Sequence, residues 1–297
     1  MALALGDTDA DGKLDIVTAN RGGKSVTLLH NAGGTFTRTD SPLEKRPDLL
    51  AAGDLTGDGR ADVVAVGEQT LFVLAGTATG LSAALTLPLG FAATGLTLAD
   101  VTGDGKVDAV LTDAVGKRVV ILPGLGNGNF SAPTVVPLAS ALGQVAAADL
   151  NADGRLDLVV TFPGEGRIGM LFGRGGGRFT TPQLVTVGKT PAALSVQDVD
   201  ADGKPDLLVT NTGDDTVSVV LNRYDPANLL RYQATAIDPD GDPITFSLES
   251  GPGGMLLDEA TGIAVGHRCP SKWATTRWCF GPATAAALTP SRASRSA

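Results

Sequence analysis

The sequence predicts an all-β repeat protein, and three observations carry that prediction. Glycine accounts for 39 of the 297 residues, against a usual share of roughly 7%, and this excess favours tight turns and short strands over helices. Only five of the 32 acidic residues are Glu, and Asp is a poor helix former but a good turn residue and oxygen ligand. Finally, a nine-residue pattern, D-x-[DTN]-x-D-G-x-x-D, recurs five times at spacings of 47, 46, 49 and 49 residues.

Each copy of the pattern lies between two predicted strands. A short apolar stretch precedes it, such as ALALG at residues 2–6, and a run of aliphatic residues follows, such as LVV at 158–160. A second apolar run comes after a Gly-containing turn, as in SVTLLHN at 25–31. About four short strands therefore fall in each repeat, which is the content of one β-propeller blade. We expect a β-propeller of five recognisable blades over residues 1–223.

The spacing inside the pattern is that of a cation site made of oxygen ligands. Side chains at positions 1, 3 and 5 converge on one ion, Gly at position 6 allows a sharp turn, position 7 supplies its carbonyl, and Asp at position 9 completes the shell. We therefore expect calcium, with the charged ends at position 7 in solvent. The predicted ligands are Asp7, Asp9, Asp11, Lys13 and Asp15; Asp54, Thr56, Asp58, Arg60 and Asp62; Asp100, Thr102, Asp104, Lys106 and Asp108; Asp149, Asn151, Asp153, Arg155 and Asp157; and Asp198, Asp200, Asp202, Lys204 and Asp206.

Two alternatives fit these residues less well. Plain D-G turns need no third and fourth carboxylate at fixed offsets. The second alternative, an EF-hand, shares positions 1 to 7 but needs a bidentate Glu at position 12, where this chain has Thr18, Ala65, Leu111, Val160 and Val209.

The first and fifth loops, with four carboxylates each, should bind calcium most tightly. Binding should be coupled to folding, because the clustered charges repel one another.

The repeated loop resembles a known family, the FG-GAP/VCBS repeats of integrin α-subunit-like propellers. The resemblance covers roughly residues 2–223, and all five loops match the Asp-rich calcium loop of that family. It implies calcium as the bound ion, a propeller fold and an extracellular setting. Such propellers usually close with seven blades, so the five blades here form either a five-bladed ring or an incomplete seven-bladed one. Because the first blade begins almost at Met1, we expect a chain truncated at its front.

A different pattern follows the repeats, at residues 224–265. Alternating stretches separated by DPDGD and GPGG turns predict part of a small β-sandwich. The stretch resembles the immunoglobulin-like, cadherin-related modules of bacterial surface proteins and covers about half of one. Asp238, Asp240 and Asp242 are either calcium ligands at a domain junction or, the interpretation we prefer, a Pro/Gly turn.

The last residues, 266–297, differ from the rest in composition. They hold both Cys, both Trp and five basic residues but no acidic one. The module's usual course could continue if the codons were read one nucleotide out of phase from Lys272 onward. We hypothesise a frameshifted tail, and the alternative is a genuine basic, disordered tail.

Composition also excludes two classes of partner. A net charge of -9 argues against nucleic acid. The sequence contains no run of 18 apolar residues, which a helix would need to cross a bilayer. The only histidines are His30, expected on a blade surface, and His267, so no catalytic triad is readable. We expect a non-catalytic, secreted or cell-surface propeller that binds an unknown protein or glycan or serves as a scaffold. The alternative is an accessory or catalytic domain of a secreted carbohydrate-active enzyme.

Overall fold

The computed structural model describes residues 2–223 and, beyond them, only five short strands. The chain divides into two compact units, Met1–Asn222 and Arg223–Ala297. The described residues contain strands and turns but no helix, and hence no helix that could span a membrane. The all-β prediction is confirmed.

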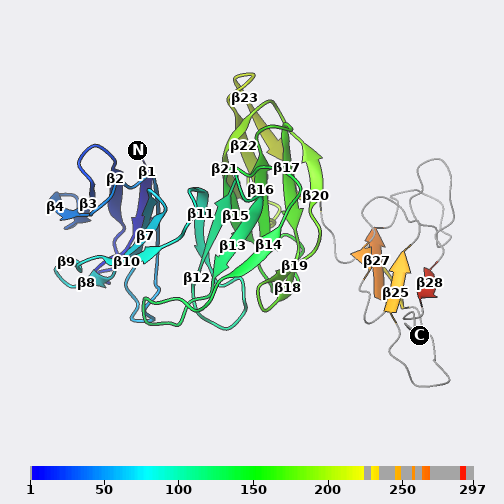
Figure 1. Ribbon diagram of the computed structural model, residues 1–297, viewed down its shortest axis with the longest axis horizontal. Helices are drawn as coiled ribbons and strands as arrows, with labels where there is room; N and C mark the ends of the chain where they lie inside the picture. The colour runs from blue at the N-terminus through cyan, green and yellow to red at the C-terminus, as the bar shows by residue number, and fades with distance from the viewer. Residues whose placement is uncertain are drawn as a thin grey trace. The chain divides into compact units, whose positions relative to one another are not determined.

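The first unit is a succession of antiparallel sheets, the blades of a β-propeller, each following the chain from one strand to its neighbour (Figure 1). The second strand of each blade begins at the ninth residue of the repeated pattern. Blade 1 contains β1 (Ala2–Gly6), β2 (Asp15–Asn20), β3 (Ser25–Asn31) and β4 (Phe36–Pro42). Blade 2 contains β5 (Leu49–Gly53), β6 (Asp62–Gly67), β7 (Thr70–Leu74) and β10 (Leu85–Pro88), with a small hairpin of β8 (Gly76–Thr77) and β9 (Gly80–Leu81).

The next blades repeat this order. Blade 3 contains β11 (Ala93–Ala99), β12 (Asp108–Asp113), β13 (Arg118–Leu122) and β14 (Thr134–Pro137). Blade 4 contains β15 (Val145–Ala148), β16 (Asp157–Phe162), β17 (Arg167–Leu171) and β20 (Gln183–Thr186), with a hairpin of β18 (Gly173–Gly175) and β19 (Arg178–Phe179). Blade 5 has three described strands, β21 (Pro191–Gln197), β22 (Asp206–Asn211) and β23 (Thr216–Val220).

The core lies between the blades, because successive side chains of a strand point to opposite faces. In β6, Val63 and Ala65 pack against blade 1, whereas Val64 and Val66 pack against blade 3. Every residue of β6, β12 and β16 is buried. This is why the predicted strands read as continuous apolar runs rather than as alternating ones.

The second unit is described only through short strands. Antiparallel pairing joins β24 (Leu229–Gln233), β27 (Ile263–His267) and β26 (Leu256–Leu257), and separately β25 (Thr245–Leu248) and β28 (Leu288–Ser291). Asp238, Asp240 and Asp242 lie outside the described residues. The immunoglobulin-like module and the frameshifted tail therefore remain predictions.

The first and last blades each carry an exposed apolar face. Leu3 and Leu5 of β1 are 58% and 53% exposed, and Val217 and Val219 of β23 are 60% and 52% exposed. Strand register places these side chains on the faces of blades 1 and 5 that turn away from the neighbouring blade. Neighbouring apolar side chains left in water favour association.

We expect the protein to self-associate through these end faces. Substituting Leu5→Lys or Val217→Lys should lower the association measured by light scattering over a concentration series, because a charge opposes burial of the face. Val115→Lys is the matched control, since Val115 is 92% exposed in a turn of blade 3. A wild-type protein that stays monomeric across the series would contradict the prediction.

Candidate metal centres

The five Asp-rich loops occupy equivalent places in the five blades. Each joins the first strand of a blade, which we call the inner strand, to the second strand, for example β1 to β2. The sequence predicts this position between two strands. The Gly at position 6 has a φ of 81° to 83° in every loop, a left-handed conformation that glycine adopts without steric cost. The five inner strands pack side by side in sequence, so the loops lie at the same end of successive blades.

The Asp at position 1 shapes the loop by accepting backbone hydrogen bonds. In the third loop, Asp100 Oδ1 accepts the amide of Asp104 at 3.1 Å and Oδ2 accepts that of Gly105 at 2.7 Å. The other first-position residues, Asp7, Asp54, Asp149 and Asp198, accept the same two amides. The first-position carboxylate therefore stabilises the turn that presents the other carboxylates.

The Asp at position 9 is fully buried and ties three segments of its blade together. Asp108 Oδ2 accepts the amides of Val101 at 2.9 Å and Thr102 at 3.0 Å, and Oδ1 accepts that of Gly124 at 2.8 Å. We call this set of hydrogen bonds to the ninth-position Asp the clasp. The sequence predicted only a cation ligand at this residue and did not predict the clasp. The same pattern recurs with Thr8 and Asn31 on Asp15, Leu55, Thr56 and Gly76 on Asp62, Leu150 and Gly173 on Asp157, and Val199 and Asn222 on Asp206.

Burial makes ionisation of three of these carboxyl groups costly. It raises the pKa of Asp157 to about 6, and it raises the pKa of Asp62 and of Asp108 as well. At Asp15 burial acts in the same direction, but hydrogen bonds, those from Thr8 among them, outweigh it and the pKa is lowered. A cation held beside a buried carboxylate would favour the ionised form.

Four of the five side chains at position 7 pair with the Asp at position 5 of the same loop, a pairing that our prediction of charged ends in solvent did not include. These side chains remain 32–53% exposed. An amine or guanidinium two residues away can reach that carboxylate across the turn. The pairs are Lys13 with Asp11, Arg60 with Asp58, Arg155 with Asp153 and Lys204 with Asp202.

Two loops bring three carboxylates together. One carboxylate oxygen from each of Asp7, Asp9 and Asp15 lies within 4.8 Å of the other two, and the same holds for the equivalent Asp198, Asp200 and Asp206. Positions 1, 3 and 9 therefore form the compact triple of the loop. These are the first and fifth loops, which have four carboxylates each.

In the second loop, position 3 is occupied by Thr56. Its buried hydroxyl lies beside the carboxylates of Asp58 and Asp62, where it favours their ionised forms. The donor sets are oxygens at the spacing expected for a hard cation. The residues therefore fit calcium.

Comparison with known proteins bears on this arrangement. The model of the family described as FG-GAP-like repeat matches residues 7–65, 54–111, 100–160 and 149–209. No curated protein matches the sequence.

Solved structures match the fold. One is a lectin of Agrocybe aegerita, described as recognising non-reducing terminal N-acetylglucosamine, with 22% identity, a TM-score of 0.51 and coverage of 78% of this chain and 70% of the lectin chain. Another is BBS1N in complex with ARL6DN, with 12% identity, a TM-score of 0.53 and coverage of 90% and 81%. At these identities the likeness shows the fold alone.

The clasp predicts a stability effect that does not depend on calcium. In excess chelator, Asp108→Ala should lower the free energy of unfolding by on the order of 3 kcal/mol or more, because three amides lose their acceptor in the interior. Asp104→Ala in the same loop should have little effect there, since Asp104 is exposed. Denaturant unfolding followed by circular dichroism measures both.

Asp108→Asn keeps one carbonyl oxygen and should fall between these two variants. It also covers the case in which the alanine variant does not fold. Equal effects of Asp108→Ala and Asp104→Ala in chelator would contradict the clasp.

Proposed function

This chain belongs to the FG-GAP-like repeat family, and on that premise we propose that it is a calcium-binding β-propeller that acts outside the cell as a ligand-binding or adhesion module. The observation that carries the calcium proposal is the carboxylate triple at positions 1, 3 and 9 of the first and fifth loops. FG-GAP-like repeats are typical of extracellular proteins, which supports the setting.

Calcium would act as a structural ion in this proposal. It would supply positive charge to carboxylates that repel one another and that are fully buried at position 9. The ninth-position Asp of each blade stands at the start of the second strand. It accepts backbone amides from the loop after the inner strand and from a residue at the end of the third strand or two residues beyond it. An ion bound to the same carboxylate would therefore stabilise the whole blade and not only the loop.

We propose a binding role rather than catalysis for the propeller. His30 is the sole histidine among residues 1–223. The clustered carboxylates accept the loops' hydrogen bonds and are the predicted calcium ligands, so we do not assign them a catalytic role. Propeller folds carry many functions, so the fold alone does not choose the ligand. Since the similar Agrocybe aegerita lectin is described as recognising terminal N-acetylglucosamine, glycans are the first ligand class to test.

Calcium should raise the stability of the protein substantially. For sites with Kd ~10⁻⁴ M in ~10⁻³ M calcium, each occupied loop contributes roughly 1.4 kcal/mol, and five independent sites contribute about 7 kcal/mol. Differential scanning calorimetry in calcium and in excess chelator should show a large fall of Tm on chelation. Magnesium should restore little, because it demands tighter octahedral geometry and keeps its waters.

Single-loop variants localise that effect. Asp11→Ala and Asp202→Ala remove a carboxylate from fully acidic loops and should reduce the calcium-dependent part of Tm more than Thr56→Ala does. An identical melting curve in calcium and in chelator would refute calcium binding and leave the loops as turns.

The binding role predicts retention of glycans without turnover. On an array that includes glycans ending in N-acetylglucosamine, the protein should bind in calcium and lose that binding in chelator, because the loops shape one end of the propeller. Chromatography of the bound glycan after incubation should return it unchanged. Released shorter sugars would instead support the carbohydrate-active enzyme, and no binding to any glycan would direct the search to protein ligands.

A further inference from the structure

Blade 1 carries a metal-ligand side chain that the other four blades lack. In each blade, Oδ1 of the ninth-position Asp accepts an amide from a residue at the end of the third strand or two residues beyond it. In blade 1 that amide belongs to Asn31, and the residue before it is His30. The residues at the same place in the other blades cannot ligate a metal ion through their side chains. They are Ala75, Pro123, Phe172 and Leu221.

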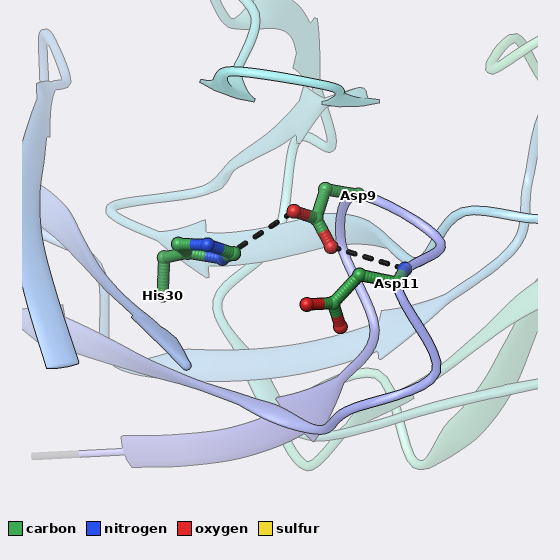
Figure 2. Close-up of side chains that lie close together, drawn as sticks. All are labelled: Asp9, Asp11 and His30. Atoms are coloured by element: carbon green, nitrogen blue, oxygen red, sulfur yellow. Dashed lines mark hydrogen bonds and ion pairs between the residues drawn. The ribbon is translucent and has the colours of Figure 1, made fainter. Parts of the chain in front are cut away.

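The imidazole of His30 points toward the first Asp loop (Figure 2). Its Nδ1 lies 3.5 Å from Asp9 Oδ2 and 3.3 Å from Asp15 Oδ1. Ligand atoms of Asp9, Asp11 and His30 all lie within 4.8 Å of one another. This second triple shares Asp9 with the triple of Asp7, Asp9 and Asp15, and its Asp11 is itself a predicted calcium ligand that pairs with Lys13. Loop 1 therefore holds two overlapping donor sets, one of oxygens alone and one that includes the imidazole nitrogen.

The chemistry of the second set differs from that of the first. Imidazole nitrogen suits zinc and neighbouring transition metals, whereas calcium takes oxygen ligands. Ligands about 2.0–2.1 Å from a tetrahedral zinc lie roughly 3.3–3.4 Å from one another. His30 Nδ1 lies at comparable distances from Asp9 Oδ2, 3.5 Å, and from Asp15 Oδ1, 3.3 Å. We propose that blade 1 binds one zinc ion through Asp9, Asp11 and His30, beside the calcium-type site of the same loop.

A pocket beside this set leaves room for a fourth ligand. Asp9 and His30 line it together with hydroxyls of β4 and of the turn between β8 and β9, and its volume is about 90 Å³. Water occupies roughly 30 Å³ in the liquid, so the pocket has room for a few water molecules or one small polar ligand. Zinc with three protein ligands keeps a fourth position that can take a water molecule or a small ligand.

A simpler role for His30 makes a different prediction. As an imidazolium it would pair with Asp9 and Asp15 and neutralise part of the loop's charge, with no metal bound. Under that role, zinc would bind the loop no better with His30 than without it. Metal titration therefore separates the two roles.

Zinc titration in saturating calcium tests the proposal directly. The second histidine and both cysteines could bind zinc by themselves, so the full chain should carry His267→Gln, Cys269→Ser and Cys279→Ser as its background. Isothermal titration calorimetry should then show one zinc equivalent that is lost, or weakened at least about tenfold, in His30→Ala. His30 is about one-third exposed as a side chain, so the variant should fold. Equal zinc binding with and without His30 would overturn the proposal.

A transplant of the site gives an independent readout. Loop 5 has the same four carboxylates, and Leu221 stands where His30 stands in blade 1. Leu221→His should add a second zinc equivalent, and Leu221→Gln is the matched control. Cobalt in place of zinc should give visible absorption bands that are weakened by His30→Ala and strengthened by Leu221→His. Cobalt spectra that are the same in all variants would contradict ligation by His30.

Discussion

The structure depends most on one buried carboxylate per blade. The ninth-position Asp is the first residue of the second strand. Its two oxygens accept amides from the start of the loop after the inner strand and from a residue at or just beyond the end of the third strand. Buried amides without an acceptor cost stability, and this single side chain satisfies two or three of them. The Asp loop is therefore part of the blade's framework and not an appendage that holds an ion.

The same residue connects the fold to the metal centres. Hydrogen bonds help to hold the loop in shape, since the first-position Asp accepts amides within the turn and the ninth-position Asp accepts amides at the start of the loop. Burial nevertheless raises the pKa of Asp157 to about 6, which means that the ionised form is disfavoured at the place where the clasp needs acceptors. In blades 2, 3 and 4, where burial raises the pKa of this Asp, a bound cation would favour its ionised form and so support the clasp.

Much of the fold could be predicted from the sequence because the repeat is so regular. The Gly at position 6, such as Gly105, and the apolar runs that became β3, β7, β13, β17 and β23 correspond to the observed turns and strands. Two features of the site could not be predicted. The clasp uses backbone amides such as that of Gly124, 16 residues beyond Asp108. Such donors cannot be recognised from the sequence, because every residue except proline has a backbone amide. We expected His30 on a blade surface, because no nearby residue in the sequence indicates that the end of β3 lies beside the loop before β2.

The exchange of backbone amides with solvent tests the central claim most directly. The account predicts that the amides of Gly76, Gly124 and Gly173 exchange slowly even in chelator, because buried carboxylates accept them, and about tenfold more slowly in saturating calcium, the equivalent of roughly 1.4 kcal/mol. Exchange in chelator as fast as that of an exposed turn would contradict the clasp. Identical rates with and without calcium would contradict the link between the clasp and the metal centre.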